Sequence, residues 1–167
     1  MLDDPTNEES RNLKKKEGVF LLVADKSDEF MKALRYAARL AEYSRSHIGL
    51  AYIIEAQDFL HWGNLEERMR AELREEAEHY LFEVATKVNG ITGERPAFYI
   101  EHGNKAEALI NIINSDHTVK MLILGGDSQG SPGPLVSYFS SKGLGQLRVP
   151  LTVVPGHLEL SDIDNIF

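Results

Sequence analysis

Hydrophobic positions along this chain alternate between short continuous apolar runs and longer segments with helical spacing. Runs without polar alternation are typical of strands covered on both faces, as in parallel sheets. The predicted strands cover residues 19–24, 47–54, 97–100, 121–124 and 149–155. Between these runs, apolar residues recur every three or four positions, which predicts amphipathic helices. The predicted helices cover residues 30–43, 65–88, 105–113 and 135–142.

The order of these elements is β-α-β-α-β-α-β-α-β. Such alternation implies right-handed crossovers between parallel strands. It predicts a single doubly wound α/β domain with a five-stranded, mainly parallel sheet and helices on both faces. Ligands of such sheets bind beyond the carboxyl ends of strands, where the strand order reverses. The ends of interest are Asp25, the segment after Ile54 and the loop 125–134.

Two flanking segments lie outside this pattern. Residues 1–17 are polar and charged, which predicts a flexible N-terminal tail. The predicted globular domain covers residues 18–156. Residues 157–167 place apolar side chains among acids, and we expect a C-terminal tail there.

The segment after the fourth predicted strand is the main candidate for chemistry. The apolar run breaks into a loop rich in Gly, Ser and Pro, and a helix-like segment follows. Such a junction exposes backbone N–H groups and the positive end of a helix dipole, which suits a phosphate. The loop has no Lys or Arg between Asp127 and Ser141. A triphosphate there would depend on N–H groups, hydroxyls and Mg²⁺ near Asp127 or Ser128.

The composition excludes several classes of function. The chain has 167 residues and a net charge of −8, which argues against nucleic acid or a membrane surface as a partner. It has no cysteine, so disulfides, thiolate metal sites and cysteine catalysis are excluded. The N-terminal segment lacks the apolar stretch of a secretory signal, which indicates a cytoplasmic protein. We find no nucleophile–base pair and no convergent metal ligands, so we expect no enzymatic activity.

Three stretches, taken in order, resemble the universal stress protein family. Residues 19–41 resemble its opening, an apolar strand that ends in an acid before Ser, further acids and an Ala-rich helix. Residues 99–108 (YIEHGNKAEA) resemble its third strand and the helix start G-(D/N)-x-A-E. Residues 149–154 resemble its closing P-V-x-V-V strand. The resemblance covers residues 18–156 and implies an adenine nucleotide alpha hydrolase-like fold. It also implies a stress-response module that binds ATP or AMP as a regulatory ligand, with Mg²⁺ if the ligand is ATP.

The glycine loop departs from the family's pattern. Members that bind nucleotide carry G-x2-G-x9-G-(S/T) after the fourth strand. In one register Gly130, Gly133 and Gly143 fill the three glycine positions, but Leu144 stands where Ser or Thr belongs. That register also brings the third glycine too close to Pro150 for the usual helix between them.

A second register keeps the first glycine at the end of the strand. Gly126 takes that position, and Gly130 follows with one extra residue between them. Ser140 and Ser141 then replace the Gly-Ser pair. We favour this second register because the family has its first glycine at the strand end.

The resemblance also implies roles for individual residues. Asp25 matches the acidic position beside the bound nucleoside, and Ile54 lies where the family packs adenine against the second strand. The candidate binding residues combine these two positions with the glycine loop. They are Asp25, Ile54, Gly125, Gly126, Ser128, Gly130, Gly133, Ser140 and Ser141. No catalytic and no metal-ligating residue is assigned.

The alternative is a dimeric interaction protein of the same fold that binds no nucleotide. Family members pair through their last strand, here between Leu151 and Val154, so a homodimer with an unidentified protein partner is implied. An edge strand exposes unpaired N–H and C=O groups, and Pro150 and Pro155 limit pairing to its middle. We expect the C-terminal tail to lie across the neighbouring subunit and to bury apolar side chains there. These side chains are Leu158, Leu160 and Phe167.

Overall fold

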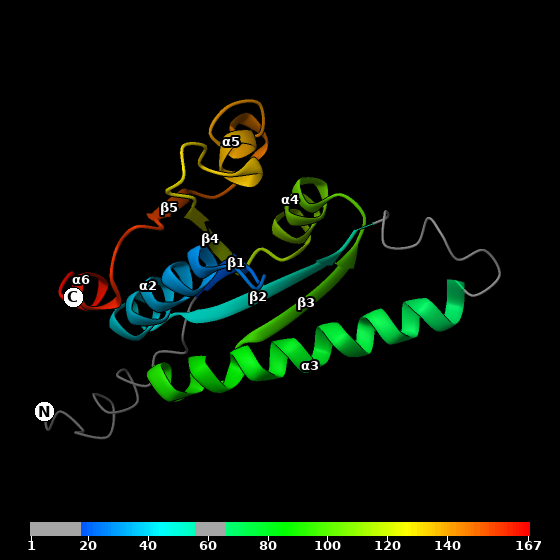
Figure 1. Cartoon of the computed structure of the whole chain (residues 1–167), viewed down its shortest axis with the longest axis horizontal. Coiled ribbons are helices and arrows are strands. Elements are labelled where there is room, and N and C mark those ends of the chain that lie inside the picture. Colours follow the sequence, from blue (N-terminus) through cyan, green and yellow to red (C-terminus); the bar gives the residue numbers. More distant parts are fainter. Residues whose placement is uncertain (1–17, 56–65) are drawn as a thin grey trace, which may run out of the picture.

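One parallel sheet organises the chain (Figure 1). The computed structural model describes residues 18–55 and 66–167, and the predicted tail 1–17 lies outside the described residues. Five strands are ordered β3-β2-β1-β4-β5, and every neighbouring pair is parallel. Their bounds are β1 Val19–Val23, β2 His47–Ile54, β3 Ala97–His102, β4 Val119–Gly126 and β5 Leu151–Pro155. The predicted α/β class and the five-stranded sheet are confirmed.

Helices cover both faces of the sheet (Figure 1). Helices α2, α3 and α6 pack on one face, and α4 and α5 pack on the other. Their bounds are α2 Asp28–Ser44, α3 Glu66–Thr92, α4 Lys105–Ser115, α5 Pro134–Phe139 and α6 Leu160–Asp164. A 3₁₀ turn, η3 (Leu144–Gln146), lies between α5 and β5. Within the described ranges, no helix combines the length and the hydrophobicity needed to cross a membrane.

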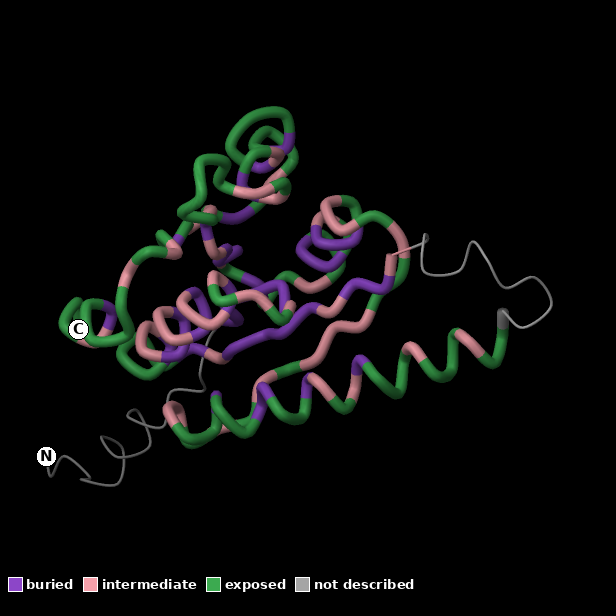
Figure 2. Tube along the Cα trace, in the orientation of Figure 1, coloured by how far each residue is buried: buried purple, intermediate pink, exposed green. Residues whose placement is uncertain are grey.

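Strand β1 lies at the centre of the hydrophobic core. All of its residues are buried, and Figure 2 shows buried positions concentrated on the strands and on the inner faces of the helices. Leu22 packs into the cluster beneath α2 and α3, whereas Leu21 packs into the cluster beneath α4 and α5. Neither side chain exposes any surface. Burial on both faces explains why the sequence of β1 is apolar without alternation.

Side-chain caps fix the starts of two helices on the carboxyl side of the sheet. Ser27 Oγ accepts a hydrogen bond from the Phe30 N–H at 3.1 Å and caps α2. Asn104 Oδ1 accepts one from the Glu107 N–H, also at 3.1 Å, and caps α4. Both caps satisfy a backbone N–H group that has no partner within its helix. The sequence predicts both helix starts from these same residues.

Helix α5 is shorter than the sequence pattern predicts. Ser140 Oγ bonds to the Val136 carbonyl, and Ser141 Oγ bonds to the Ser137 carbonyl, each at 2.6 Å. Such side-chain bonds compete with continuation of the helix. Gly143 is fully surrounded here, because an added Cβ would lie 2.3 Å from a carbon of the Tyr138 ring. The chain therefore turns towards η3 where the pattern predicts another helical turn.

The C-terminal segment, expected as a tail, packs against α2 of its own chain. Ile163 on α6 has no exposed surface, and Leu158 packs against the core beneath α2. Leu160 and Phe167 remain 48% and 37% exposed. Pairing of this segment with a second subunit stays a prediction.

We expect Phe139→Ala to destabilise the protein by about 3–5 kcal/mol, because it opens a cavity where α5 meets the sheet. Phe139 has no exposed surface. Phe82→Ala is the matched control, since Phe82 is 61% exposed and contacts mainly the edge of the Phe98 ring. Urea unfolding followed by circular dichroism measures both variants. A Phe139→Ala variant no less stable than Phe82→Ala contradicts the described packing of α5.

Candidate ligand pocket at the switch point of the sheet

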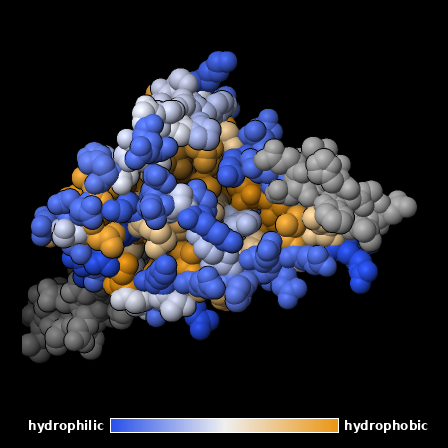
Figure 3. Space-filling view, in the orientation of Figure 1, coloured by the Kyte–Doolittle hydropathy of each residue, from blue (hydrophilic) through white to orange (hydrophobic). Residues whose placement is uncertain are grey.

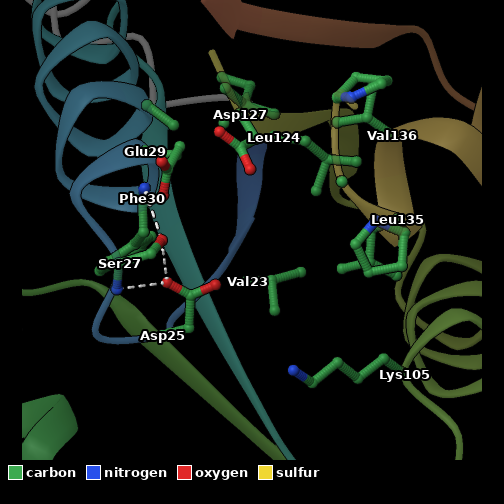
Figure 4. A pocket seen from close by; sticks show the side chains of 16 residues that line it. Val23, Asp25, Ser27, Glu29, Phe30, Lys105, Leu124, Asp127, Leu135 and Val136 are labelled. Carbon is green, nitrogen blue, oxygen red and sulfur yellow. Dashed lines mark hydrogen bonds between the residues drawn. The ribbon is translucent and has the colours of Figure 1, made fainter. Parts of the chain in front are cut away.

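A cavity opens where the strand order of the sheet reverses. The chain builds β2 and β3 on one side of β1, and β4 and β5 on the other. The reversal between β1 and β4 is the position at which doubly wound sheets bind ligands. A cavity of about 230 Å³, the switch-point pocket, lies beyond the carboxyl ends of these two strands. Its walls come from β1, β4, the loop after β4, and the starts of α2, α4 and α5 (Figure 4).

Part of the pocket wall is apolar. In the space-filling view, hydrophobic residues lie between α2 and α5, among hydrophilic ones (Figure 3). Ligand pockets in proteins combine an apolar lining of this kind with a few polar groups that orient the ligand. The apolar lining residues are Val23, Phe30, Ala33, Ile123, Leu124, Pro132, Pro134, Leu135 and Val136.

The start of α2 is pressed against the end of β4. A Cβ added at Gly125 would lie 2.3 Å from the Glu29 carbonyl oxygen, a distance that real structures do not tolerate. Gly125 and Glu29 both line the switch-point pocket. The absence of a side chain at this glycine therefore allows the start of α2 to lie against the end of β4, beside the pocket.

Three carboxylates line the pocket, those of Asp25, Glu29 and Asp127. Asp25 Oδ1 accepts hydrogen bonds from Ser27 N–H at 2.8 Å and from Ser27 Oγ at 2.5 Å. Figure 4 shows the second Asp25 oxygen turned away from Ser27, towards the cavity. Asp127 Oδ1 accepts from the Gln129 N–H at 2.8 Å. Within the described ranges, no three His, Asp or Glu side chains are grouped as ligands for a metal ion.

A tyrosine of α3 holds the backbone beside the pocket. The Tyr80 hydroxyl donates a hydrogen bond to the Asp25 carbonyl. Burial, followed by the negative charge of Asp25, raises the pKa of Tyr80 to about 12. The Tyr80 ring also meets Tyr52 edge-on at 6.2 Å and lies 5.6 Å from the Lys26 ammonium. Asp25 is therefore fixed by Ser27 through its side chain and by Tyr80 through its carbonyl.

Lys105 is the one basic side chain among the residues that line the pocket. It is the first residue of α4, directly after the Asn104 cap. Figure 4 shows its side chain extending towards Val23 and Asp25. Among the residues that the structure describes, its ammonium group has no hydrogen-bond or ion-pair partner. The group is therefore available to an anion in the cavity.

The glycine loop forms a turn with two left-handed residues. Gly130 and Gly133 have φ angles of +102° and +94°, which glycine adopts readily and other residues adopt at a cost. The Asp127 N–H closes the loop on the Pro132 carbonyl at 3.2 Å. Gly133 is the N-cap of α5, and Pro134 follows without an N–H group to offer.

The structure brings only part of the predicted site together. Asp25, Gly125 and Gly133 line the pocket. The other predicted residues do not line it. Gly126 is the last residue of β4, and Ser128 and Gly130 lie in the loop that follows. Ser140 and Ser141 lie beyond the C-terminal end of α5, and Ile54 is buried in β2 with 2% of its surface exposed. Contact of any of these residues with a ligand stays a prediction.

Sequence reasoning missed Ser27, Glu29 and Phe30 at the start of α2, and Lys105 at the start of α4. A signal for them exists in the sequence. All four residues follow predicted strands, and the carboxyl ends of parallel strands meet at one edge of the sheet. The sequence suggests Asp127 only as a possible ligand for Mg²⁺, whereas in the structure Asp127 is one of the residues that line the cavity.

The fold and the pocket together define a doubly wound α/β protein with a cavity between the ends of the first and fourth strands. The chain belongs to the universal stress protein family, whose sequence profile matches residues 19–155. No curated protein matches the sequence significantly.

Solved structures of this family have the same fold. Universal stress protein UspA from Lactobacillus plantarum is 16% identical, with a TM-score of 0.64 over 84% of this chain and 99% of that one. A universal stress protein in complex with cAMP is 13% identical, with a TM-score of 0.59 over 85% and 99%. The universal stress protein from Archaeoglobus fulgidus in complex with dAMP is 11% identical, with a TM-score of 0.57 over 83% and 98%. At these identities the likeness establishes the fold.

We expect Gly125→Ala to destabilise the protein by about 1–3 kcal/mol, because the new methyl group collides with the backbone of α2. Gly145→Ala is the matched control, since nothing lies within 4 Å of a Cβ added there. Chemical unfolding of both variants gives the comparison. Equal midpoints for the two variants contradict the close approach of α2 to β4.

Proposed function

We propose that this protein is a cytoplasmic stress-response regulator that binds an adenine nucleoside monophosphate in the switch-point pocket and disfavours ATP. The observation that carries this proposal is the charge of the pocket, which is lined by one lysine and three acidic residues. Two similar structures of the family, in complex with cAMP and dAMP, support an adenine nucleotide with a single phosphate. The proposed ligand is a signal and not a substrate, because the hydroxyl among the lining residues that bonds to a carboxylate, Ser27 Oγ on Asp25, also accepts the Phe30 N–H as the cap of α2.

The nucleoside part of such a ligand fits the residues present. A carboxylate at the end of a strand is a suitable acceptor for ribose hydroxyl groups in doubly wound folds. Asp25 has that position, and Ser27 occupies only one of its two oxygens. The apolar wall from Phe30 to Val136 offers a surface for a base.

The phosphate part limits the ligand to one phosphate. Lys105 supplies one cation, and it has no partner among the described residues. A chain of three phosphates would bring further negative charge close to Glu29 and Asp127, and like charges in a partly desolvated cavity repel. Mg²⁺ would reduce this repulsion, so the preference is expected to be strongest without the metal.

The loop after β4 gives only weak support to a longer phosphate chain. Helix α5 has six residues, and its first residue, Pro134, has no N–H group. The hydroxyls of Ser140 and Ser141 bond to carbonyls of α5 itself. The loop and α5 therefore provide few free N–H or hydroxyl groups that could bind further phosphates at the pocket.

We expect the protein to bind AMP at least about tenfold more tightly than ATP in the absence of Mg²⁺. A difference in affinity of this size corresponds to the gain or loss of about one charged contact. Lys105→Gln should weaken the binding of AMP about tenfold and leave the binding of adenosine nearly unchanged, because the proposed partner of the lysine is the phosphate. Isothermal titration calorimetry with AMP, ATP and adenosine measures all three affinities.

Asp127→Asn tests the repulsion directly. Removing this carboxylate should reduce the difference in affinity between AMP and ATP. Lys120→Gln is the control and should leave that difference unchanged, because Lys120 lies on β4 at the end opposite the pocket. Absence of binding by all three ligands at millimolar concentration contradicts the proposed function. ATP binding as tight as AMP without Mg²⁺ contradicts its charge argument.

A second proposed function is homodimerisation through β5. Within residues 18–55 and 66–167, this strand pairs only with β4, so its outer edge offers backbone groups that no described strand uses. Val153 lies in the middle of β5 and is 39% exposed, which supports an apolar contact there.

We expect Val153→Asp to convert the proposed dimer to a monomer, because two buried carboxylates would face each other across the twofold axis. Leu144→Asp is the matched control, since Leu144 is 54% exposed on η3, away from the strand. Light scattering coupled to size-exclusion chromatography gives the mass of each variant. A wild-type protein that is monomeric at all concentrations, or a Val153→Asp dimer, contradicts this pairing.

A further inference from the structure

The C-terminal latch, residues 156–167, is bound to the outer face of α2 by charged groups. Arg35 donates two hydrogen bonds to the Asp164 carboxylate, from Nε at 2.8 Å and from Nη2 at 2.7 Å. Lys32 Nζ donates to the Leu158 carbonyl at 2.5 Å. Two parallel hydrogen bonds between a guanidinium and a carboxylate fix the relative orientation of the two groups, and here they fix the position of α6 on α2.

Apolar contacts complete the docking of the latch. Ile163 has no exposed surface and belongs to the same hydrophobic cluster as Phe30, which lines the pocket. The Phe167 ring lies 5.5 Å from the Tyr36 ring and 6.5 Å from the Tyr43 ring. Figure 1 shows α6 beside α2, at the side of the sheet that also carries β5.

Gly156, the first residue of the latch, contacts residues at the edge of the switch-point pocket. The Gly156 N–H donates to the Gly126 carbonyl at 2.8 Å. A Cβ added at Gly156 would lie 2.5 Å from that oxygen and 2.9 Å from Glu29 Cγ. Glu29 lines the pocket, so one glycine contacts both the end of β4 and a pocket residue.

We propose that the C-terminal latch is a regulatory element, whose docking on α2 is energetically coupled to the order of the switch-point pocket. One helix carries both surfaces. Glu29, Phe30 and Ala33 line the pocket, while Lys32 and Arg35 bind the latch within the same two turns. Release of the latch therefore loosens the start of α2, and a ligand that orders the pocket strengthens latch docking by the same free energy.

The latch is built to open separately from the rest of the fold. Its single helix has five residues, and the Arg35 and Asp164 side chains are each about one-third exposed. Segments with few buried side chains open at a lower free energy than the core. Opening removes one fully buried side chain, Ile163, from the core cluster and leaves the sheet intact.

Hydrogen exchange followed by mass spectrometry tests the coupling without any ligand. Arg35→Gln and Asp164→Asn should each speed exchange in residues 157–167 by about two- to fivefold, the effect of losing a partly exposed ion pair. Both substitutions should also speed hydrogen exchange at the pocket, in residues 27–33 at the start of α2 and in residues 125–133 after β4. The two variants combined should exchange no faster than Asp164→Asn alone, because that substitution already removes the pair with Arg35 as well as the longer contact with Arg39 at 3.8 Å.

Arg74→Gln is the matched control. It breaks a single, more exposed arginine–carboxylate contact of 3.2 Å to Glu78, which lies on α3 and not on the latch or α2. Exchange in the latch and the pocket should not change in this variant. Faster exchange of residues 157–167 with an unchanged pocket overturns the coupling, and unchanged exchange of residues 157–167 overturns the latch itself.

Adding AMP extends the test and is the part that rests on the proposed function. In the wild type, AMP should slow exchange in residues 157–167, and in Asp164→Asn this slowing should be smaller. Calorimetry on the same samples shows whether AMP binds. Binding without slower exchange in the latch overturns the coupling, whereas absence of binding overturns the proposed ligand and leaves the ligand-free comparison to decide on the latch.

Discussion

The close approach of α2 to the ends of β4 and β5 is the constraint on which the rest of this structure depends. Two glycines allow it. Neither Gly125 nor Gly156 has room for a Cβ against the backbone and side chain of Glu29. This contact fixes the start of α2 beside the switch point, and the start of α2 then supplies one wall of the pocket. Pocket shape, the position of β5 and the direction of the C-terminal segment all follow from the same contact.

Charge decides what a fold of this kind can bind. The geometry of the switch point is shared by doubly wound proteins with many different ligands. Here Asp25, Glu29 and Asp127 line the cavity and Lys105 alone balances them. A carboxylate suits hydroxyl donors, and a single ammonium suits a single phosphate. The ligand class proposed above therefore rests on four side chains from four different segments, not on the glycine loop alone.

The sequence was informative about the fold because its signals are local or periodic. Continuous apolar runs predicted five parallel strands, which the structure confirms, although the edge strands β3 and β5 are largely exposed or half-buried. The residues Ser27 and Asn104 predicted two helix starts that the structure also confirms. The same reasoning failed at the end of α5, where the hydroxyls of Ser140 and Ser141 bond to the helix itself. Periodicity cannot reveal this competition, since these serines are equally compatible with another helical turn.

The sequence by itself determined the family, the α/β class and the strand ends where a ligand would lie. Only the tertiary structure decided which residues share the cavity, because Lys105 and Glu29 are distant in sequence and line the same pocket only once the parallel strands align. It also decided the place of the C-terminal segment. Asp164 reaches Arg35 across 129 positions of the chain, and a contact of that separation leaves no periodic or local mark in the sequence.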